Sequence, residues 1–187
     1  MAIKVAVNRA LTAITALPTA AALTDGHLTL LTTATASSSS TISFTSNIDS
    51  TYHEYLFKFF DIHPNGDAKQ FQFQADTGTN TSYNQTLTTS TFTAYHNEDG
   101  DSTALVYADN DQSVSGTLHL FNPSSTTFVK HFLARSSTYT ANNHCYDLHV
   151  GGYFNTTTAI TRVQFKYTGD TIDAGTIKMY GVGPKQS

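Results

Sequence analysis

The alternation of apolar and polar residues in short segments is the feature that most limits how this chain can fold. In QFQFQA, residues 70–75, Phe71, Phe73 and Ala75 alternate with glutamines. Successive side chains of a β-strand point to opposite faces, so the segment predicts a strand with one buried face. The same pattern recurs in RVQFKY, residues 162–167, where the side chains predicted to lie on the buried face are Val163, Phe165 and Tyr167.

Other short segments rich in β-branched and aromatic residues also predict strands, and turn signals such as PNGD at 64–67 separate them. They are ISF at 42–44, EYLFKFFDI at 54–62, TLTTSTFTAYH at 86–96, TALVYA at 103–108, GTLHLF at 116–121, TFVKHFLA at 127–134, CYDLHVGGYF at 145–154 and GTIKMYGV at 175–182. EYLFKFFDI is apolar on both faces, which indicates a central or covered strand. About eight to ten strands without a helical period between them predict an all-β, antiparallel β-sandwich, with a jelly roll as the first choice.

The first 36 residues differ in character from the rest of the chain. They are rich in Ala, Leu and Thr and contain no Phe, Tyr or Trp. Apolar residues at helical spacing from Val7 to Leu17 precede Pro18 and indicate a short amphipathic helix, and an extended arm is equally compatible with so many threonines. We therefore predict an anchoring N-terminal arm or short helix at 1–36 and a β-sandwich domain at 37–187.

Composition excludes several classes of protein. Charged residues make up 13% of the chain and the net charge is −4, with the basic residues scattered singly, so no nucleic-acid partner is expected. No apolar run reaches the roughly 20 residues that a membrane-spanning helix needs, so no membrane partner is expected either. The single cysteine, Cys145, excludes an internal disulfide, and we predict that it is a small buried hydrophobic residue.

Two histidines flank the turn in HLFNPSSTTFVKHF, residues 119–132. If this turn closes a hairpin, His119 and His131 lie opposite or nearly opposite each other on one face. A zinc site would need further ligands, for which only His144 and His149 are candidates. We therefore favour a cross-strand polar pair or a subunit contact over a metal site.

The acidic segments HNEDGDS at 96–102 and DNDQS at 109–113 contain the oxygen ligands that calcium prefers. Neither completes a calcium-binding loop, because Leu120 stands where an EF-hand that starts at Asp109 needs its terminal glutamate. We favour solvated loops over a calcium site.

No catalytic motif is present. The sequence has no HExxH, no nucleophile elbow and no phosphate-binding glycine loop. We predict that the chain is not an enzyme, that it needs no cofactor, and that it has no catalytic, cofactor-binding or metal-binding residues. Six tyrosines offer rings on which sugars could stack, but strand alternation favours core or interface positions for them. They are Tyr52, Tyr55, Tyr83, Tyr95, Tyr139 and Tyr146.

Several segments together resemble a family of small structural proteins of tailed phages, found in phages of marine and cyanobacterial hosts. The segments lie in family order between about residues 35 and 183. They are SSSTISFTSNIDSTYHEYLFKFFDIHPNGD, AYHNEDGDS, GTLHLFNPSSTTFVKHF, GGYFNTTTAITRVQFKY and DAGTIKMYGVG. Members often begin near the TASSSS joint at residues 35–40, so the first 35 residues look like an addition.

The resemblance implies a virion protein made in the host bacterial cytoplasm. By analogy of fold we expect a capsid decoration or cement protein that bridges capsid subunits. The expected partners are the major capsid protein or other virion proteins and further copies of this chain, with a homotrimer favoured. The alternative is a tail or fibre module that binds host surface glycan.

Overall fold

The computed structural model describes residues 28–97, 113–140 and 144–183. It contains ten β-strands in this part of the chain, and no helix there is able to span a membrane. The strands are β1 Leu28–Thr35, β2 Ile42–Phe44, β3 Glu54–Pro64, β4 Phe71–Thr77, β5 Leu87–Asn97, β6 Val114–Phe121, β7 Lys130–Thr140, β8 His144–Phe154, β9 Ile160–Tyr167 and β10 Ile172–Val182.

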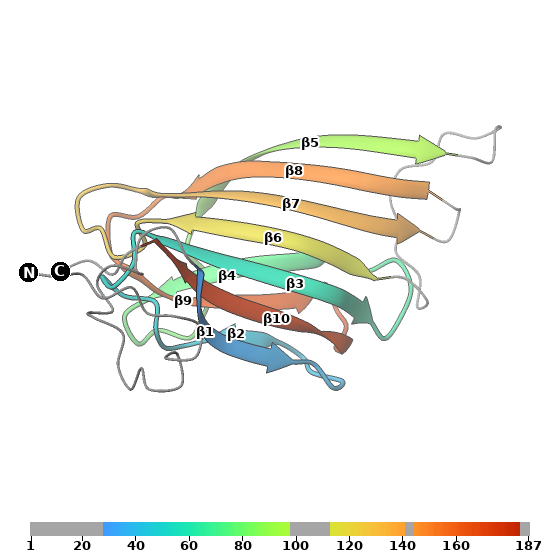
Figure 1. Ribbon diagram of the computed structural model, residues 1–187, viewed down its shortest axis with the longest axis horizontal. Helices are drawn as coiled ribbons and strands as arrows, with labels where there is room; N and C mark the ends of the chain where they lie inside the picture. Colours follow the sequence, from blue (N-terminus) through green and yellow to red (C-terminus); the bar gives the residue numbers. More distant parts are fainter. Residues whose placement is uncertain (1–27, 98–112, 141–143, 184–187) are drawn as a thin grey trace, which may run out of the picture.

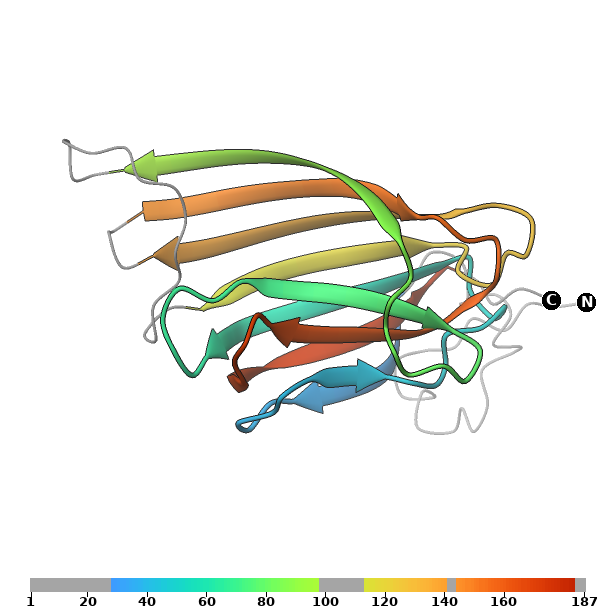
Figure 2. The same cartoon turned by 180° about the vertical axis from the view of Figure 1, so that it is seen from behind.

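The strands form two antiparallel sheets of unequal width that face each other (Figure 1). The large sheet has seven strands in the order β1-β10-β3-β6-β7-β8-β5, and the small sheet has three in the order β2-β9-β4. Seen from the opposite side, the small sheet lies over β1, β10, β3 and β6, and most of β5 extends away from it (Figure 2). The small sheet therefore covers only part of the large one.

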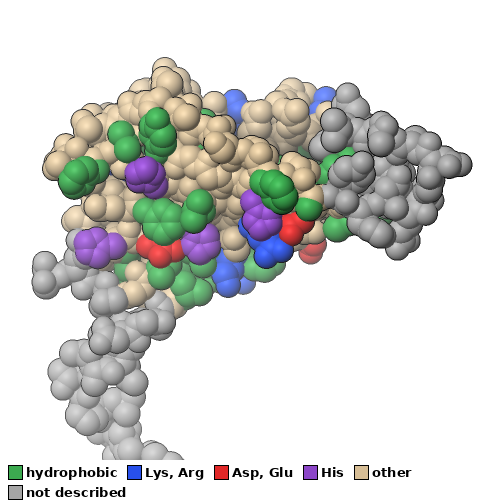
Figure 3. Space-filling model, turned by 90° about the horizontal axis from the view of Figure 1, so that it is seen from above, with side chains coloured by type: hydrophobic (Ala, Val, Ile, Leu, Met, Phe, Trp, Pro, Cys, Tyr) green, Lys and Arg blue, Asp and Glu red, His purple; other side chains and the backbone are tan. Residues whose placement is uncertain are grey.

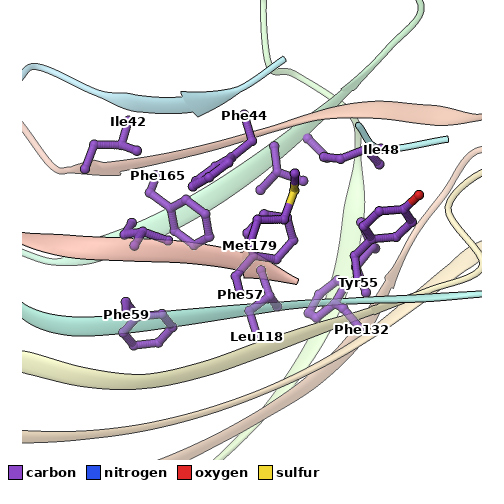
Figure 4. Packing of buried hydrophobic residues seen from close by; sticks show 14 of the residues in the cluster. Ile42, Phe44, Ile48, Tyr55, Phe57, Phe59, Leu118, Phe132, Phe165 and Met179 are labelled. Carbon is purple, nitrogen blue, oxygen red and sulfur yellow. The ribbon is translucent and has the colours of Figure 1, made fainter. Parts of the chain in front are cut away.

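The core lies between the two sheets and is dominated by aromatic rings (Figure 4). Phe165, from the centre of the small sheet, is its hub. Its ring centroid lies 5.6 Å from that of Phe57 on β3 and 5.7 Å from that of Phe71, on which it stacks. Aromatic pairs at such distances add to the stabilisation from area burial alone.

The core continues towards β7 and β8 through a second aromatic group. Phe73 meets Phe132 at 5.0 Å edge to face, and Phe132 lies 5.3 Å from Phe154. Past this second aromatic group, the inward-facing Thr89, Thr91 and Thr93 of β5 are exposed, so the small sheet does not cover this part of the large sheet.

A fully buried carboxylate fixes the connection from the small sheet to the far edge of the large sheet. Asp76, at the end of β4, accepts hydrogen bonds from the backbone N–H of Tyr83 at 2.7 Å and of Thr77 at 2.9 Å. The side chain of Gln85 donates a third at 3.2 Å. These contacts hold residues 78–86 in a loop over the end of the sandwich, after which β5 pairs with β8.

The fold class predicted from the sequence is confirmed: the chain is all-β, with antiparallel sheets in a sandwich-like arrangement. The inward faces of QFQFQA and RVQFKY and the central position of β3 are as predicted. A jelly roll is not established, since β5 pairs with β8 at the far side of the large sheet and does not join β4.

The boundary predicted at residue 36 lies too far along the chain. β1 falls inside the predicted arm and pairs with β10 as the edge of the large sheet, so the sandwich includes residues 28–36. The predicted helix between Val7 and Leu17 and the predicted strand at 103–108 lie outside the described residues.

Replacing the buried carboxylate should destabilise the fold. Asp76→Ala leaves the Tyr83 N–H buried without its acceptor, and we expect the free energy of unfolding to fall by about 3 kcal/mol. Chemical denaturation measures the change. Asp173→Ala is the matched control, because Asp173 accepts a hydrogen bond from Ser38 at the exposed surface, and we expect a change within about 0.5 kcal/mol. Equal effects of the two substitutions would contradict this role for Asp76.

Candidate interaction surface

The outer face of the large sheet, which points away from the small sheet, carries most of the exposed large hydrophobic side chains. Strand register places the exposed Phe92 of β5, Leu133 of β7 and Tyr139 of β7 there, and their exposed fractions are 69%, 55% and 47%. Phe60 of β3 and Leu28 and Leu30 of β1 share this face. A broad sheet face on which several large apolar side chains are exposed is a candidate interaction surface.

Near one end of this face, an acidic side chain holds one of the histidines that flank the hairpin. His119 of β6 lies next to Leu56 of β3, and its Nδ1 donates to Glu54 Oε1 at 2.5 Å. The imidazole also stacks on Phe121, with ring centroids 6.2 Å apart and an interplanar angle of 18°. The imidazole is therefore fixed in orientation by an acid on one strand and a ring on its own strand.

His131 lies nearby but has a different partner. His119 is paired with Leu133, so His131 is two residues along β7 on the same face. Its ring centroid is 5.8 Å from that of Tyr153 on β8. The predicted hairpin is confirmed, and the two histidines are diagonal neighbours, with separate partners from β3 and β8.

A shallow depression of about 440 Å³ lies beside His131 and Tyr153. Gly151 forms its floor, because a residue with no side chain stands here between Leu133 of β7 and Ser90 of β5. Phe121, His131 and Tyr153 provide aromatic walls, and Thr88 and Ser90 provide hydroxyl groups. A side chain at residue 151 would fill this floor, since its Cβ would lie 3.3 Å from Leu133.

A charged cluster occupies the same face closer to its other end. Arg135 donates from Nε and Nη2 to the two carboxylate oxygens of Asp147, at 2.9 and 2.7 Å. The hydrogen bonds from Arg135 lower the pKa of Asp147 to about 2. His149 Nε2 lies 3.4 Å from Asp147 Oδ1, and its ring neighbours the exposed Phe92 at 6.3 Å. Figure 3, from above, shows histidines beside hydrophobic and charged side chains in groups of this kind.

Within the described residues, no three histidine, cysteine, aspartate or glutamate side chains gather as metal ligands would. His149 is bound to Asp147 and is not near His119 in strand register, while the side chain of His144 lies outside the described part. The two acidic segments considered for calcium lie at residues 98–112, also outside it, apart from their ends.

The tyrosines considered for sugar stacking are mostly core residues, as expected. Tyr52, Tyr55, Tyr83 and Tyr146 are buried, Tyr139 is exposed on the outer face, and the side chain of Tyr95 is outside the described part. Burial raises the pKa of Tyr55 to about 12, and its hydroxyl is held by Asp49.

The prediction that Cys145 is buried is wrong: it is exposed on the outer face of β8, 3.8 Å from the Ser137 hydroxyl.

Sequence reasoning missed the residues that give this face its character. Glu54, Asp147 and Gly151 meet their partners only through pairing between strands, β3 with β6 for Glu54 and β7 with β8 for Asp147 and Gly151. One signal was available: in CYDLHVGGYF, Cys145, Asp147 and His149 share one strand face and alternate with Tyr146, Leu148 and Val150. That alternation marks the first three as outward side chains.

No family model, curated protein or solved structure matches the chain.

The ion pair makes a direct prediction about titration. In the protein, Asp147 should lose its charge only as the pH falls through about 2, well below its ordinary value of 3.8. In Arg135→Gln the midpoint should return towards 3.8, because the hydrogen bonds to the carboxylate are gone. Side-chain carboxyl chemical shifts in NMR measure both midpoints.

The lowered pKa of Asp147 determines how the stability of the protein changes with pH. The stabilisation from the pair is complete above pH 3.8 and disappears as the pH falls through about 2. Lys58→Gln is the matched control, since it removes a cation from the same face two strands away. Lys58→Gln should leave the titration midpoint of Asp147 unchanged. An equal shift of this midpoint in both variants would show that the lowered pKa does not come from Arg135.

Proposed function

We propose that this protein is a non-enzymatic structural component of a tailed-phage virion, and specifically a capsid decoration protein. The large sheet would lie with its outer face against the major capsid protein and bridge neighbouring capsid subunits, and copies of the chain would associate as a homo-oligomer, with a trimer favoured. The resemblance of residues 35–183 to phage structural proteins supports the assignment to a virion structural protein. The outer face of the large sheet is the surface that would attach to the capsid.

The observation that carries this proposal is the large, gently twisted outer face with exposed apolar side chains. Phe60, Phe92, Leu133 and Tyr139 point outward from β3, β5 and β7, interspersed with histidines and one ion pair. Interfaces combine aromatic and apolar residues in this way with polar groups around them. A broad sheet face suits contact with another protein surface.

Placing negative charges among the exposed apolar side chains of the outer face should release the protein from particles. We expect Leu133→Asp together with Phe92→Asp to lower the number of copies per virion at least about tenfold, because two exposed apolar side chains would become charged inside an interface. Quantitative mass spectrometry of purified particles measures the copies. Ser43→Asp is the matched control on the exposed face of the small sheet and should leave occupancy unchanged.

The absolute copy number separates head from tail. Hundreds of copies of the unaltered protein per particle are expected for a decoration protein. A few to a few dozen copies would contradict the decoration role and favour the tail. Circular dichroism of each purified variant checks that the fold is retained, so that lost occupancy reports on the interface.

The depression floored by Gly151 favours one second candidate, a tail or fibre module that binds host glycan. Aromatic rings next to hydroxyl groups suit a sugar, which stacks its apolar face and hydrogen-bonds its edge. On this hypothesis Tyr153→Ala lowers affinity for a glycan found on an array by about fivefold or more, or ~1 kcal/mol. Tyr180→Ala, on the same face but outside the depression, should not. An array without any bound glycan excludes this candidate.

A further inference from the structure

The unequal widths of the sheets leave the small sheet with an open edge over apolar surface. In the described part of the chain, β4 pairs with β9 along one side and with no strand along the other. An edge of this kind presents unpaired backbone N–H and C=O groups to any further strand. The inner side of β7 and β8 extends past this edge without cover from the small sheet.

A groove of about 430 Å³ lies between the open edge of β4 and that inner side. Phe71 and Phe73 of β4 form one wall, and Leu118, Ala134, Leu148 and Val150 of the large sheet contribute its apolar floor. The floor side chains of β7 and β8 are half-buried, in contrast to the fully buried Leu118. Among the described residues, these side chains of β7 and β8 are therefore packed on one side only.

We propose that a strand formed by residues 2–8 of a second copy of this chain docks in this groove and pairs with the free edge of β4. Facing sheets lie about 10 Å apart and neighbouring strands about 4.8 Å apart. A strand added beside β4 would then lie directly above β7 and β8. Alternate side chains of the added strand would point down onto Ala134, Leu148 and Val150. Recognition by strand addition works in this way, with backbone pairing for affinity and side-chain pockets for selectivity.

The sequence of the segment has the pattern that such a site selects. Residues 2–8 read AIKVAVN, so Ile3, Val5 and Val7 alternate with Ala6 and other small or polar residues. In a strand the three β-branched side chains share one face, towards the groove, and Lys4 and Ala6 take the solvent face. The floor residues Ala134, Ser136 and Thr138 of β7 are small, which leaves space for branched side chains above them.

The position of the chain's entry into the sandwich favours a second copy as the source. Leu28 pairs with Val182, which pairs with Glu54, so the N-terminal segment joins the sandwich at the end of the sheet where β3 begins. The groove lies towards the other end, where Val114 and Thr138 pair. A segment of the same chain reaches the groove only if residues 9–27 double back along roughly 36 Å, the length of an 11-residue strand, which they are long enough to do. A neighbouring copy can approach from the groove's own end of the sheet without doubling back, and exchange of identical segments is a low-cost route to oligomers.

Photo-cross-linking of the full-length protein tests both the site and the source. Benzoylphenylalanine replaces Leu148 in an unlabelled chain, which is mixed with an excess of ¹⁵N-labelled unaltered chain and irradiated. Mass spectrometry of tryptic peptides is expected to find Leu148-position cross-links to the labelled peptide of residues 5–9. The same photo-residue at Ser43, on the exposed face of the small sheet, should give none.

A pair of substitutions one residue apart supplies the decisive control. Val5→Asp in the labelled chain would place a carboxylate in the apolar groove and should lower the cross-link yield about tenfold or more. Ala6→Asp adds the same charge on the opposite face and should leave the yield within about twofold. Cross-links to unlabelled chain alone would overturn the second copy as the source. Cross-links to residues 98–112 instead, no cross-link to residues 5–9, or equal losses in the two variants would overturn the docking itself.

The test does not depend on the virion assignment. It uses purified protein in solution, so particle occupancy and strand exchange can each fail without the other.

Discussion

The connection that leads from the small sheet to the far edge of the large sheet is held by the buried carboxylate of Asp76. A charge removed from water must be compensated by hydrogen bonds, and the backbone of Tyr83 and Thr77 and the side chain of Gln85 provide three. These bonds tie the loop after β4 over the end of the sandwich, and the next strand begins beyond the small sheet. β5 pairs along its whole length with β8, and no strand in the described part of the chain pairs with the outer edge of β4.

The unequal widths of the two sheets leave two surfaces on opposite sides of the large sheet. The β6–β7 hairpin and β8 widen the large sheet, and β5 completes it, but nothing in the described chain widens the small sheet to match. The inner side of β7 and β8 therefore lines an apolar groove. The outer side of β5, β7 and β8 carries Phe92, Leu133, His131 and His149. A sheet whose described neighbours leave apolar side chains partly exposed on both sides is better suited to contact other chains than to stand alone.

Local patterns predicted the strands well because the alternation of apolar and polar residues along a strand shows which of its side chains face the core. QFQFQA and RVQFKY each show which side chains enter the core, and Phe71, Phe73 and Phe165 meet there as expected. β1 escaped prediction because LTLLTTAT has no regular alternation, and the bulge between Leu30 and Thr32 shows why. Cys145 is exposed although free cysteines are usually buried, because the alternation of side chains in β8 places it on the same outward face as Asp147 and His149.

The interactions that shape the outer face lay beyond the pattern of any single segment, since each joins side chains from different strands. The spacing of His119 and His131 placed both on one face of a hairpin, but Glu54 comes from β3 and Tyr153 from β8. With those partners, each imidazole is fixed to a neighbour from another strand and the two do not form the corners of a shared metal site. Both histidines then serve to order a sheet face whose neighbouring apolar side chains are exposed, and a preordered face loses less side-chain entropy when it meets a partner. The two sides of the sheet therefore differ: contacts between strands order the side chains of the outer side, whereas the inner side of β7 and β8 lines an apolar groove.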